Sequence, residues 1–177
     1  MTNYRRAKIA GGTYFFTVNP AQRGKTTLTD RIDYLRAAVR AAKHAHPFHI
    51  DAWVVMPDHL HAVWTLPPGD ADFSNRWRRI KMQFSMLIDS GKQISTSRER
   101  KGELGIWQRR FWEHLIHDET DFARHVDYVH INPVKHGFVK RVRDWPYSTF
   151  HRYVRQGIYD LEWGCEIDED FAVGEFE

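Results

Sequence analysis

The chain has 177 residues, of which 42% are hydrophobic and 28% charged, a composition typical of one folded domain with a sizeable core. No apolar run approaches the roughly 18 residues of a membrane helix, and no apolar signal-peptide core follows the basic N-terminus. We therefore expect a cytoplasmic protein with no membrane partner. A single cysteine, Cys165, excludes an intramolecular disulfide and a cysteine-based zinc site.

Charge is divided sharply along the sequence. Residues 1–159 hold all 26 Lys and Arg together with 15 acidic residues, whereas residues 160–177 hold eight acidic residues and no Lys or Arg. A basic body with seven Trp favours a nucleic-acid-binding surface, although a merely solvated basic surface would have the same composition. We predict one domain at 1–159, with a basic N-terminal arm, and an acidic tail at 160–177 that is either disordered or docked on the body.

The first predicted elements are a strand and a helix. Tyr14–Asn19 is aromatic and β-branched, which is typical of a strand. Thr29 or Asp30 can cap a helix that runs to about Ala45, and Pro47 stops this helix.

A predicted hairpin follows and carries the most informative residues. Residues 48–56 and 59–66 form its strands, joined by a tight turn. His59 and His61 point to the same face of the second strand, whose other face is wholly apolar. We expect the apolar face to meet the core and the histidine face to stay open. Two imidazoles on one face form a natural clamp for a divalent metal.

The second half predicts a helix at 73–88, a fourth strand at 106–116, and a helix at 118–132 that Pro133 ends. The resulting order of elements is that of a split βαβ, ferredoxin-like antiparallel sheet, an α+β fold. We expect helices on one face of this sheet. The other face, carrying the histidines, would be free to hold a strand of DNA.

Tyr128 and Asn132 lie one turn apart on one face of the last predicted helix. A phenol, a metal clamp and an oxygen ligand together would form a site for attacking a phosphodiester. A phenol with a pKa of about 10 is a poor nucleophile at neutral pH, so it needs a metal-polarised phosphate or a base. Each residue also has an ordinary interpretation: a histidine pair on a strand is usually a surface feature, and Tyr128 could pack in a core stripe.

Four neighbouring residues have weaker interpretations. His125, three positions before Tyr128, is a fallback metal ligand. His114 could support the site, although a structural role is favoured, and we expect His130 to be packed. Asp58 could orient a metal-bound histidine, but we expect it mainly to close the hairpin turn.

Several blocks of the sequence together resemble one protein family. His59-Leu-His fits the His–hydrophobe–His signature of the single-tyrosine HUH endonucleases, and the surrounding blocks resemble the bacterial REP-associated tyrosine transposases. The matching blocks span residues 3 to about 159 and are Asn3-Tyr-Arg-Arg, Gly12-Thr-Tyr-Phe-Phe-Thr-Val-Asn, Ala52-Trp-Val-Val-Met-Pro-Asp-His-Leu-His-Ala-Val-Trp, Arg76-Trp-Arg-Arg-Ile-Lys, Trp107-Gln-Arg-Arg-Phe-Trp-Glu-His and Tyr128-Val-His-Ile-Asn-Pro-Val-Lys-His-Gly.

The resemblance implies the HUH endonuclease fold and a metal-dependent endonuclease and strand transferase for single-stranded DNA with REP-type hairpins. The family tyrosine attacks the scissile phosphate and leaves a 5′-phosphotyrosine and a free 3′-OH; the matching residue is Tyr128. His59, His61 and Asn132 would hold Mg²⁺ or Mn²⁺. The resemblance favours a monomer, although related insertion-sequence transposases are dimers that exchange the tyrosine helix.

Basic residues should divide the DNA contacts, mostly to phosphate, and two of them in the arm could read the foot of the hairpin. The predicted set is Arg5, Arg6, Arg76, Arg78, Arg79, Lys81, Arg109 and Arg110. The alternative function is a sequence-specific hairpin-binding protein without catalytic activity. A relaxase-like or replication-initiating nuclease is disfavoured by the small size. The acidic tail could lie over the basic groove and restrain activity.

Overall fold

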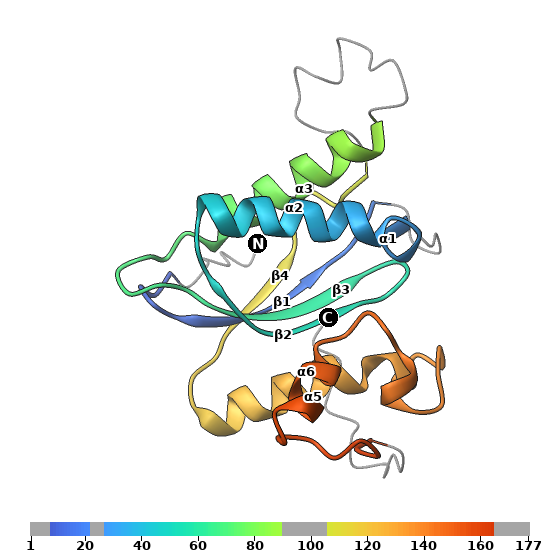
Figure 1. Ribbon diagram of the computed structural model, residues 1–177. Coiled ribbons are helices and arrows are strands. Elements are labelled where there is room, and N and C mark those ends of the chain that lie inside the picture. The colour runs from blue at the N-terminus through green and yellow to red at the C-terminus, as the bar shows by residue number, and fades with distance from the viewer. Residues whose placement is uncertain (1–7, 22–26, 90–105, 165–177) are drawn as a thin grey trace, which may run out of the picture.

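The computed structural model describes residues 8–21, 27–89 and 106–164, and its centre is a four-stranded antiparallel sheet (Figure 1). The strands are β1 (Thr13–Val18), β2 (His49–Val55), β3 (Leu60–Thr65) and β4 (Trp112–Leu115), in the spatial order β2-β3-β1-β4. Helices follow β1 and β3, so two βαβ units interleave. The predicted α+β, ferredoxin-like fold is therefore confirmed.

Two helices, α2 (Ile32–Ala45) and α3 (Phe73–Asp89), cover one face of the sheet (Figure 1). Leu35 lies on the buried stripe of α2. The fully buried indole rings of Trp64 on β3 and Trp77 on α3 stack with their centroids 4.2 Å apart. This is the apolar layer that the alternation along β3 predicts.

The start of α2 differs from the prediction. Thr29 and Asp30 belong to a separate short helix, α1 (Thr27–Asp30), and Arg31 takes the N-cap position of α2 without a side-chain capping bond. The proposed cap at Thr29 or Asp30 is therefore wrong. The apolar face of α2 stabilises the helix through packing, as is usual for helices of this length.

The opposite face of the sheet is also covered, by α5 (Glu119–Lys135), with α6 (Phe150–Arg155) beside it (Figure 1). Phe15 of β1 and Val63 of β3 belong to a second buried cluster with Val126 and Val129 of α5. The expectation of helices on one face only, with an open face for DNA, is therefore wrong. The histidines made this face look polar along β3, but the neighbouring strands make it apolar enough to bury a helix.

Pro133 lies inside α5, contrary to the prediction that it ends this helix. The helix continues to Lys135, and the chain leaves it at Gly137, whose positive φ of 72° is the usual left-handed exit from a helix. Proline lacks the N–H that would donate to the Val129 carbonyl, so α5 forgoes one main-chain hydrogen bond here and still continues for two residues. Asn132 consequently keeps helical geometry one turn after Tyr128.

β4 is much shorter than the predicted strand at 106–116. Only Trp112–Leu115 forms the strand and pairs with β1, at the edge of the sheet. Arg109 and Arg110 are exposed before it, and an isolated bridge between Pro20 and Trp107 is the earlier pairing.

Beyond α5, the short helices η1 (Val142–Asp144) and α6 (Phe150–Arg155) complete the second layer. Packing continues past the predicted domain end at 159, because the Trp163 ring stacks on that of Tyr159 with centroids 4.4 Å apart. The basic arm and the acidic residues 165–177 lie outside the described residues, so the predicted arm and tail keep the status of predictions. Among the described helices, none is long and apolar enough to cross a membrane.

Candidate active site

The two histidines of the predicted clamp lie side by side at the start of β3. Their ring centroids are 5.0 Å apart in an edge-to-face arrangement. His59 Nδ1 is hydrogen-bonded to the Asp58 carboxylate at 2.8 Å, and His61 Nδ1 to the Thr17 hydroxyl at 2.9 Å on β1. These bonds fix the rings and leave Nε2 as the nitrogen that each can offer to a metal. Asp58 thus contacts His59 directly, beyond the turn-closing role that we expected.

Helix α5 brings Tyr128 to the histidine pair. The ring centroids of Tyr128 and His61 are 5.3 Å apart, and Phe15 packs against both rings. Lys135, two turns later on α5, places its Nζ 5.1 Å from the centroid of the Tyr128 ring. The structure therefore joins the clamp and the phenol that the sequence placed some seventy residues apart.

Asn132 supplies an oxygen atom at the same place. It is fully buried, and its Nδ2 donates a hydrogen bond to the main-chain carbonyl of Tyr128 at 2.8 Å. Only the NH₂ end of the amide can donate, so Oδ1 points elsewhere, and it accepts no hydrogen bond within the described residues. A buried carbonyl oxygen without a partner is costly unless a ligand such as a metal ion satisfies it. Two imidazole nitrogens and one amide oxygen suit Mn²⁺ and tolerate Mg²⁺, so these residues fit the predicted metal.

Electrostatics prepare His61 for the same role. Burial holds the pKa of His61 well below its ordinary value, and the nearby His59 and His136 lower it further. The side chain of the adjacent Asn132 raises this pKa, but by less than burial lowers it. Neutral imidazole is the form that ligates metals. His61 therefore needs to lose no proton before it binds a metal at neutral pH.

Exposure shows how a substrate could reach the phenol. Tyr128 and Asn132 are buried, whereas Lys135 and His136, at the end of α5, are exposed. The His136 ring lies 4.9 Å from that of His59. Substrate would therefore approach past the C-terminal end of α5. Lys135 and His136 were not predicted as site residues, although their position two turns after Tyr128 was an available signal.

No family model matches the chain. A REP-associated tyrosine transposase of Escherichia coli K12 is 50% identical to it over 175 residues, which cover 99% of this chain and 98% of that protein. The chain belongs to the REP-associated tyrosine transposase family.

Two further relatives agree with this assignment. A protein of Haemophilus influenzae is 46% identical to this chain over 169 residues, which cover 95% of this chain and 96% of that protein. The solved structure of a REP-associated tyrosine transposase bound to a REP hairpin matches with a TM-score of 0.83 and 49% identity, over 99% of this chain and 98% of that chain.

The transposase has a second histidine group, at the start of α5. His114 Nε2 and His125 Nδ1 each lie 2.9 Å from an oxygen of the Asp121 carboxylate, and the two rings stack with centroids 4.6 Å apart. The ligating atoms lie within 4.8 Å of one another, a spacing that a metal ion could bridge. The contact between His114 and Asp121 connects β4 to α5, so the group has a structural role without a metal. His125 therefore belongs to this group rather than to the clamp.

Arg76 is not available for DNA. Its side chain is 2% exposed and pairs with Asp70 at 2.6 Å, and it also donates to the main-chain carbonyls of His46, Pro47 and Asp72. The prediction of a DNA contact at Arg76 is therefore wrong, because this guanidinium ties the start of α3 to the end of α2. The arginine pattern on α3 could not reveal which member faced inward.

The other predicted DNA contacts of the transposase differ in availability. Arg79 is half-buried, and Lys81 donates to the main-chain carbonyl of Gln108 at 2.9 Å. Arg5 and Arg6 lie outside the described residues. The exposed members of the set are Arg78, Arg109 and Arg110.

Proposed function

We propose that the chain is a metal-dependent endonuclease and strand transferase for single-stranded DNA with REP-type hairpins, acting through a 5′-phosphotyrosine. The observation that carries the proposal is the contact between the rings of Tyr128 and His61, 5.3 Å apart. The names of the relatives support it, since one is a tyrosine transposase and the solved one is bound to a REP hairpin.

In this proposal His59, His61 and Asn132 hold Mg²⁺ or Mn²⁺. The bound metal would polarise an oxygen of the scissile phosphate and so favour attack on phosphorus. Asp58 and Thr17 hold the two imidazoles in the orientation that presents Nε2.

Tyr128 is the nucleophile. Its phenolic oxygen forms a bond to the scissile phosphorus, and the bond from phosphorus to O3′ breaks. The phenolic proton passes to solvent, and O3′ takes up a proton to become a free 3′-OH. The ammonium of Lys135, 5.1 Å from the centroid of the Tyr128 ring, places a positive charge beside the site of attack. Because the phosphotyrosine is still a phosphodiester, attack by another 3′-OH can rejoin strands without ATP.

The exposed arginines are proposed to bind DNA phosphates. Arg78 on α3 and Arg109 and Arg110 before β4 are open to solvent, as phosphate contacts require. Arg79 and Lys81 remain proposed as secondary contacts, and Arg5 and Arg6 as readers of the hairpin foot.

We also propose that one chain forms a complete site. α5 packs on the sheet of its own chain, and Tyr128 contacts His61 of the same chain, so no exchange of helices is needed. A mass measurement by light scattering should give a monomer with and without hairpin; a stable dimer would contradict this part of the proposal.

A denaturing gel tests the chemistry. Labelled single-stranded REP hairpins are incubated with the chain and Mn²⁺, and we expect a covalent adduct that a chelator abolishes. Tyr128→Phe should form no adduct, whereas Tyr34→Phe, which removes an exposed hydroxyl on α2, should form it normally. Tight hairpin binding without an adduct under any metal would instead support the alternative function, a hairpin-binding protein without catalytic activity.

A further inference from the structure

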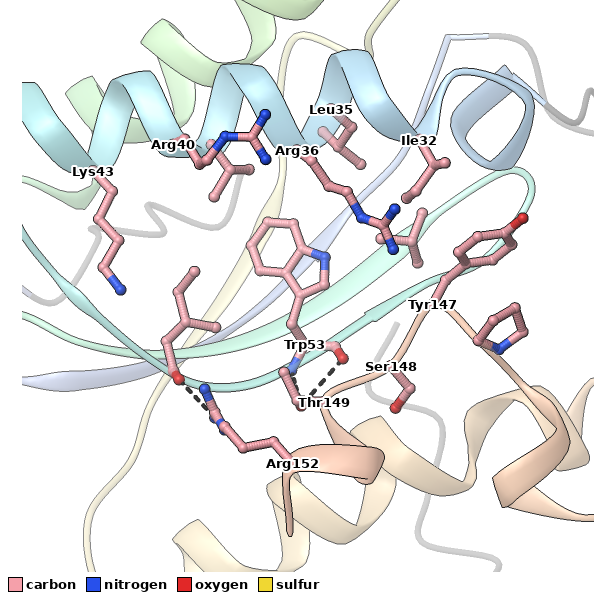
Figure 2. Close-up of a pocket in the computed structure, with 14 residues that line it drawn as sticks. Ile32, Leu35, Arg36, Arg40, Lys43, Trp53, Tyr147, Ser148, Thr149 and Arg152 are labelled. Carbon is pink, nitrogen blue, oxygen red and sulfur yellow. Dashed lines mark hydrogen bonds between the residues drawn. The ribbon is translucent and has the colours of Figure 1, made fainter. Parts of the chain in front are cut away.

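A second concave feature lies away from the histidine pair, at the edge of the sheet. It is a cavity of about 330 Å³ between α2, the edge strand β2 and the segment 146–152 (Figure 2). Its volume lies at the lower end of the range of about 300–1,000 Å³ that small-ligand sites occupy, enough for a group of nucleotide size. Trp53 lies at its centre, with one face of the ring toward the core, where it stacks near Trp64 and Trp77.

The edge of β2 at this pocket is already hydrogen-bonded to another segment of the chain. The Val55 N–H donates to the Tyr147 carbonyl, and the Trp53 N–H donates to the Thr149 hydroxyl. The Thr149 N–H in turn donates to the Trp53 carbonyl. Segment 147–149 therefore already occupies the edge of β2, and a ligand must be recognised by side chains.

Those side chains are aromatic, aliphatic and cationic. Arg36, Arg40 and Lys43 line the α2 side at helical spacing, and no Asp or Glu is among the described residues that line the cavity (Figure 2). Arg36 pairs with a neighbouring carboxylate at 3.3 Å, whereas the other two cations make no hydrogen bond or ion pair within the described part of the chain. Cations above a floor that contains Trp53 and Tyr147 suit a phosphate joined to a planar base.

A row of aromatic rings connects this pocket with the histidine pair. The ring of His136, 4.9 Å from that of His59, lies 6.3 Å from Phe138. Phe138 in turn lies 5.5 Å from Trp145, and Trp145 lies 5.5 Å from Tyr147 at the pocket. Phe138 is 45% exposed, so its ring is open to stacking by a base.

We propose that the pocket and this aromatic row bind the unpaired nucleotides that lead from the hairpin to the scissile phosphate. One base stacks in the pocket on Trp53 and Tyr147, and its phosphates lie against Arg40 and Lys43. Exposed rings such as Phe138 carry the bases between the pocket and Tyr128. This inference rests on the proposed function, because it assigns the place of the single-stranded part of that substrate.

Binding measurements on Tyr128→Phe, which forms no adduct, separate this inference from the chemistry. The probes are one REP hairpin prepared blunt and the same hairpin with four unpaired nucleotides at the 5′ or the 3′ side. The test variants are Tyr147→Ala and the double change Arg40→Ala with Lys43→Ala. The double change Lys140→Ala with Arg155→Ala alters the same charge at exposed positions elsewhere and serves as control.

We expect Tyr147→Ala to weaken binding of one extended hairpin by about 5- to 100-fold and to leave the blunt hairpin unchanged. The Arg40 and Lys43 change should reduce the slope of log Kd against log salt for that extended hairpin by about 1.4, or roughly 0.7 for each phosphate contact with a single strand. An equal loss on the blunt hairpin would place the stem in the pocket and overturn the proposal, and so would no loss at all.

Photo-crosslinking gives a second measurement that does not depend on a variant. With 5-iodouracil placed along the extension, crosslinks should map to peptides that contain Trp53, Phe138 or Tyr147. Crosslinks confined to other peptides would overturn the proposal. If binding depends on the unpaired extension but the unmodified chain forms no adduct, the role of the pocket is supported and the proposed chemistry is contradicted. The two proposals can therefore fail separately.

Discussion

The side-chain amide of Asn132 donates a hydrogen bond to the main-chain carbonyl of Tyr128, 2.8 Å away. The turn of helix that carries the proposed nucleophile thereby sets the direction of the Asn132 Oδ1 atom. That atom is buried and accepts no hydrogen bond from any described residue. One turn of α5 therefore fixes the positions of both the phenol and the third proposed metal ligand.

Removing the Asn132 oxygen should weaken metal binding more than it lowers the stability of the fold. We expect Asn132→Ala to form the DNA adduct at least 10-fold more slowly at low Mn²⁺, with partial recovery as Mn²⁺ rises, because a weakened site can be filled by more metal. Asn132→Gln, which keeps an amide oxygen, should retain more activity. Adduct rates over a Mn²⁺ titration test this, and an equal loss at every metal concentration would contradict a ligand role.

Lys135 offers a test of the positive charge beside the proposed nucleophile. Lys135→Gln removes the cation whose Nζ lies 5.1 Å from the centroid of the Tyr128 ring, so we expect the adduct rate to fall while hairpin affinity changes little. Lys140→Gln removes an exposed cation elsewhere and should change neither. An equal loss of rate and of hairpin affinity would indicate an ordinary phosphate contact instead. The measurements are single-turnover adduct formation and hairpin titration.

Much of the fold could be predicted from local patterns. The apolar alternation along β3 and the helical spacing on α3 are properties of one element each, so the sequence reveals them directly. The meeting of His61 with Tyr128 was predicted only through the spacing of several motifs together. Asn132 and its orphan oxygen fit that expectation.

Features that depend on other elements were missed. Phe15 on β1 and Val63 on β3 together make the histidine face apolar, and neither strand alone shows that α5 will cover it. In the sequence Arg76 resembles its exposed neighbour Arg78. The groups that accept hydrogen bonds from the Arg76 guanidinium, the Asp70 carboxylate and main-chain carbonyls of other segments, lie outside α3. Pro133 removes one main-chain donor from α5 without ending it, because the helix is stabilised by packing on the sheet, which its own sequence does not show.

Arg76 and Arg78 should have opposite effects. Arg76→Leu leaves the carboxylate of Asp70 and several carbonyls without a donor, so the free energy of unfolding should fall by about 3 kcal/mol while hairpin affinity of the folded protein stays unchanged. Arg78→Leu should lower hairpin affinity and leave stability within about 0.5 kcal/mol. Urea unfolding and hairpin titrations on both variants test the contrast, and weaker hairpin binding by folded Arg76→Leu would restore it as a contact.

The acidic tail can be tested by removing residues 165–177, which hold six acids and no Lys or Arg. The cut must follow Gly164, because Trp163 packs on Tyr159. If the tail competes with DNA for the basic surface, its removal should tighten hairpin binding and speed adduct formation. A Gly/Ser segment of the same length should act like the deletion. Unchanged affinity and rate in both variants would exclude restraint by the tail.

His130 should make stability depend on pH. It is fully buried on α5, as predicted, with its Nε2 2.8 Å from the Thr149 hydroxyl. Burial lowers the pKa of His130 to about 3, and the nearby Arg152 and His151 contribute to the shift. Above the ordinary pKa of about 6.5 the ring is neutral in both states, so its titration does not change stability with pH in that range.

Below pH 6.5 the unfolded chain binds a proton that the folded chain excludes. The free energy of unfolding should therefore fall toward acid by up to about 1.4 kcal/mol per pH unit through this residue, or about 2 kcal/mol by pH 5. His130→Gln should be less stable at pH 8, yet its stability should decline less between pH 6.5 and 4. Urea midpoints at several pH values test this, with the exposed His44→Gln as control. Equal declines for His130→Gln and the unmodified chain would contradict it, because the other buried histidines contribute identically to both.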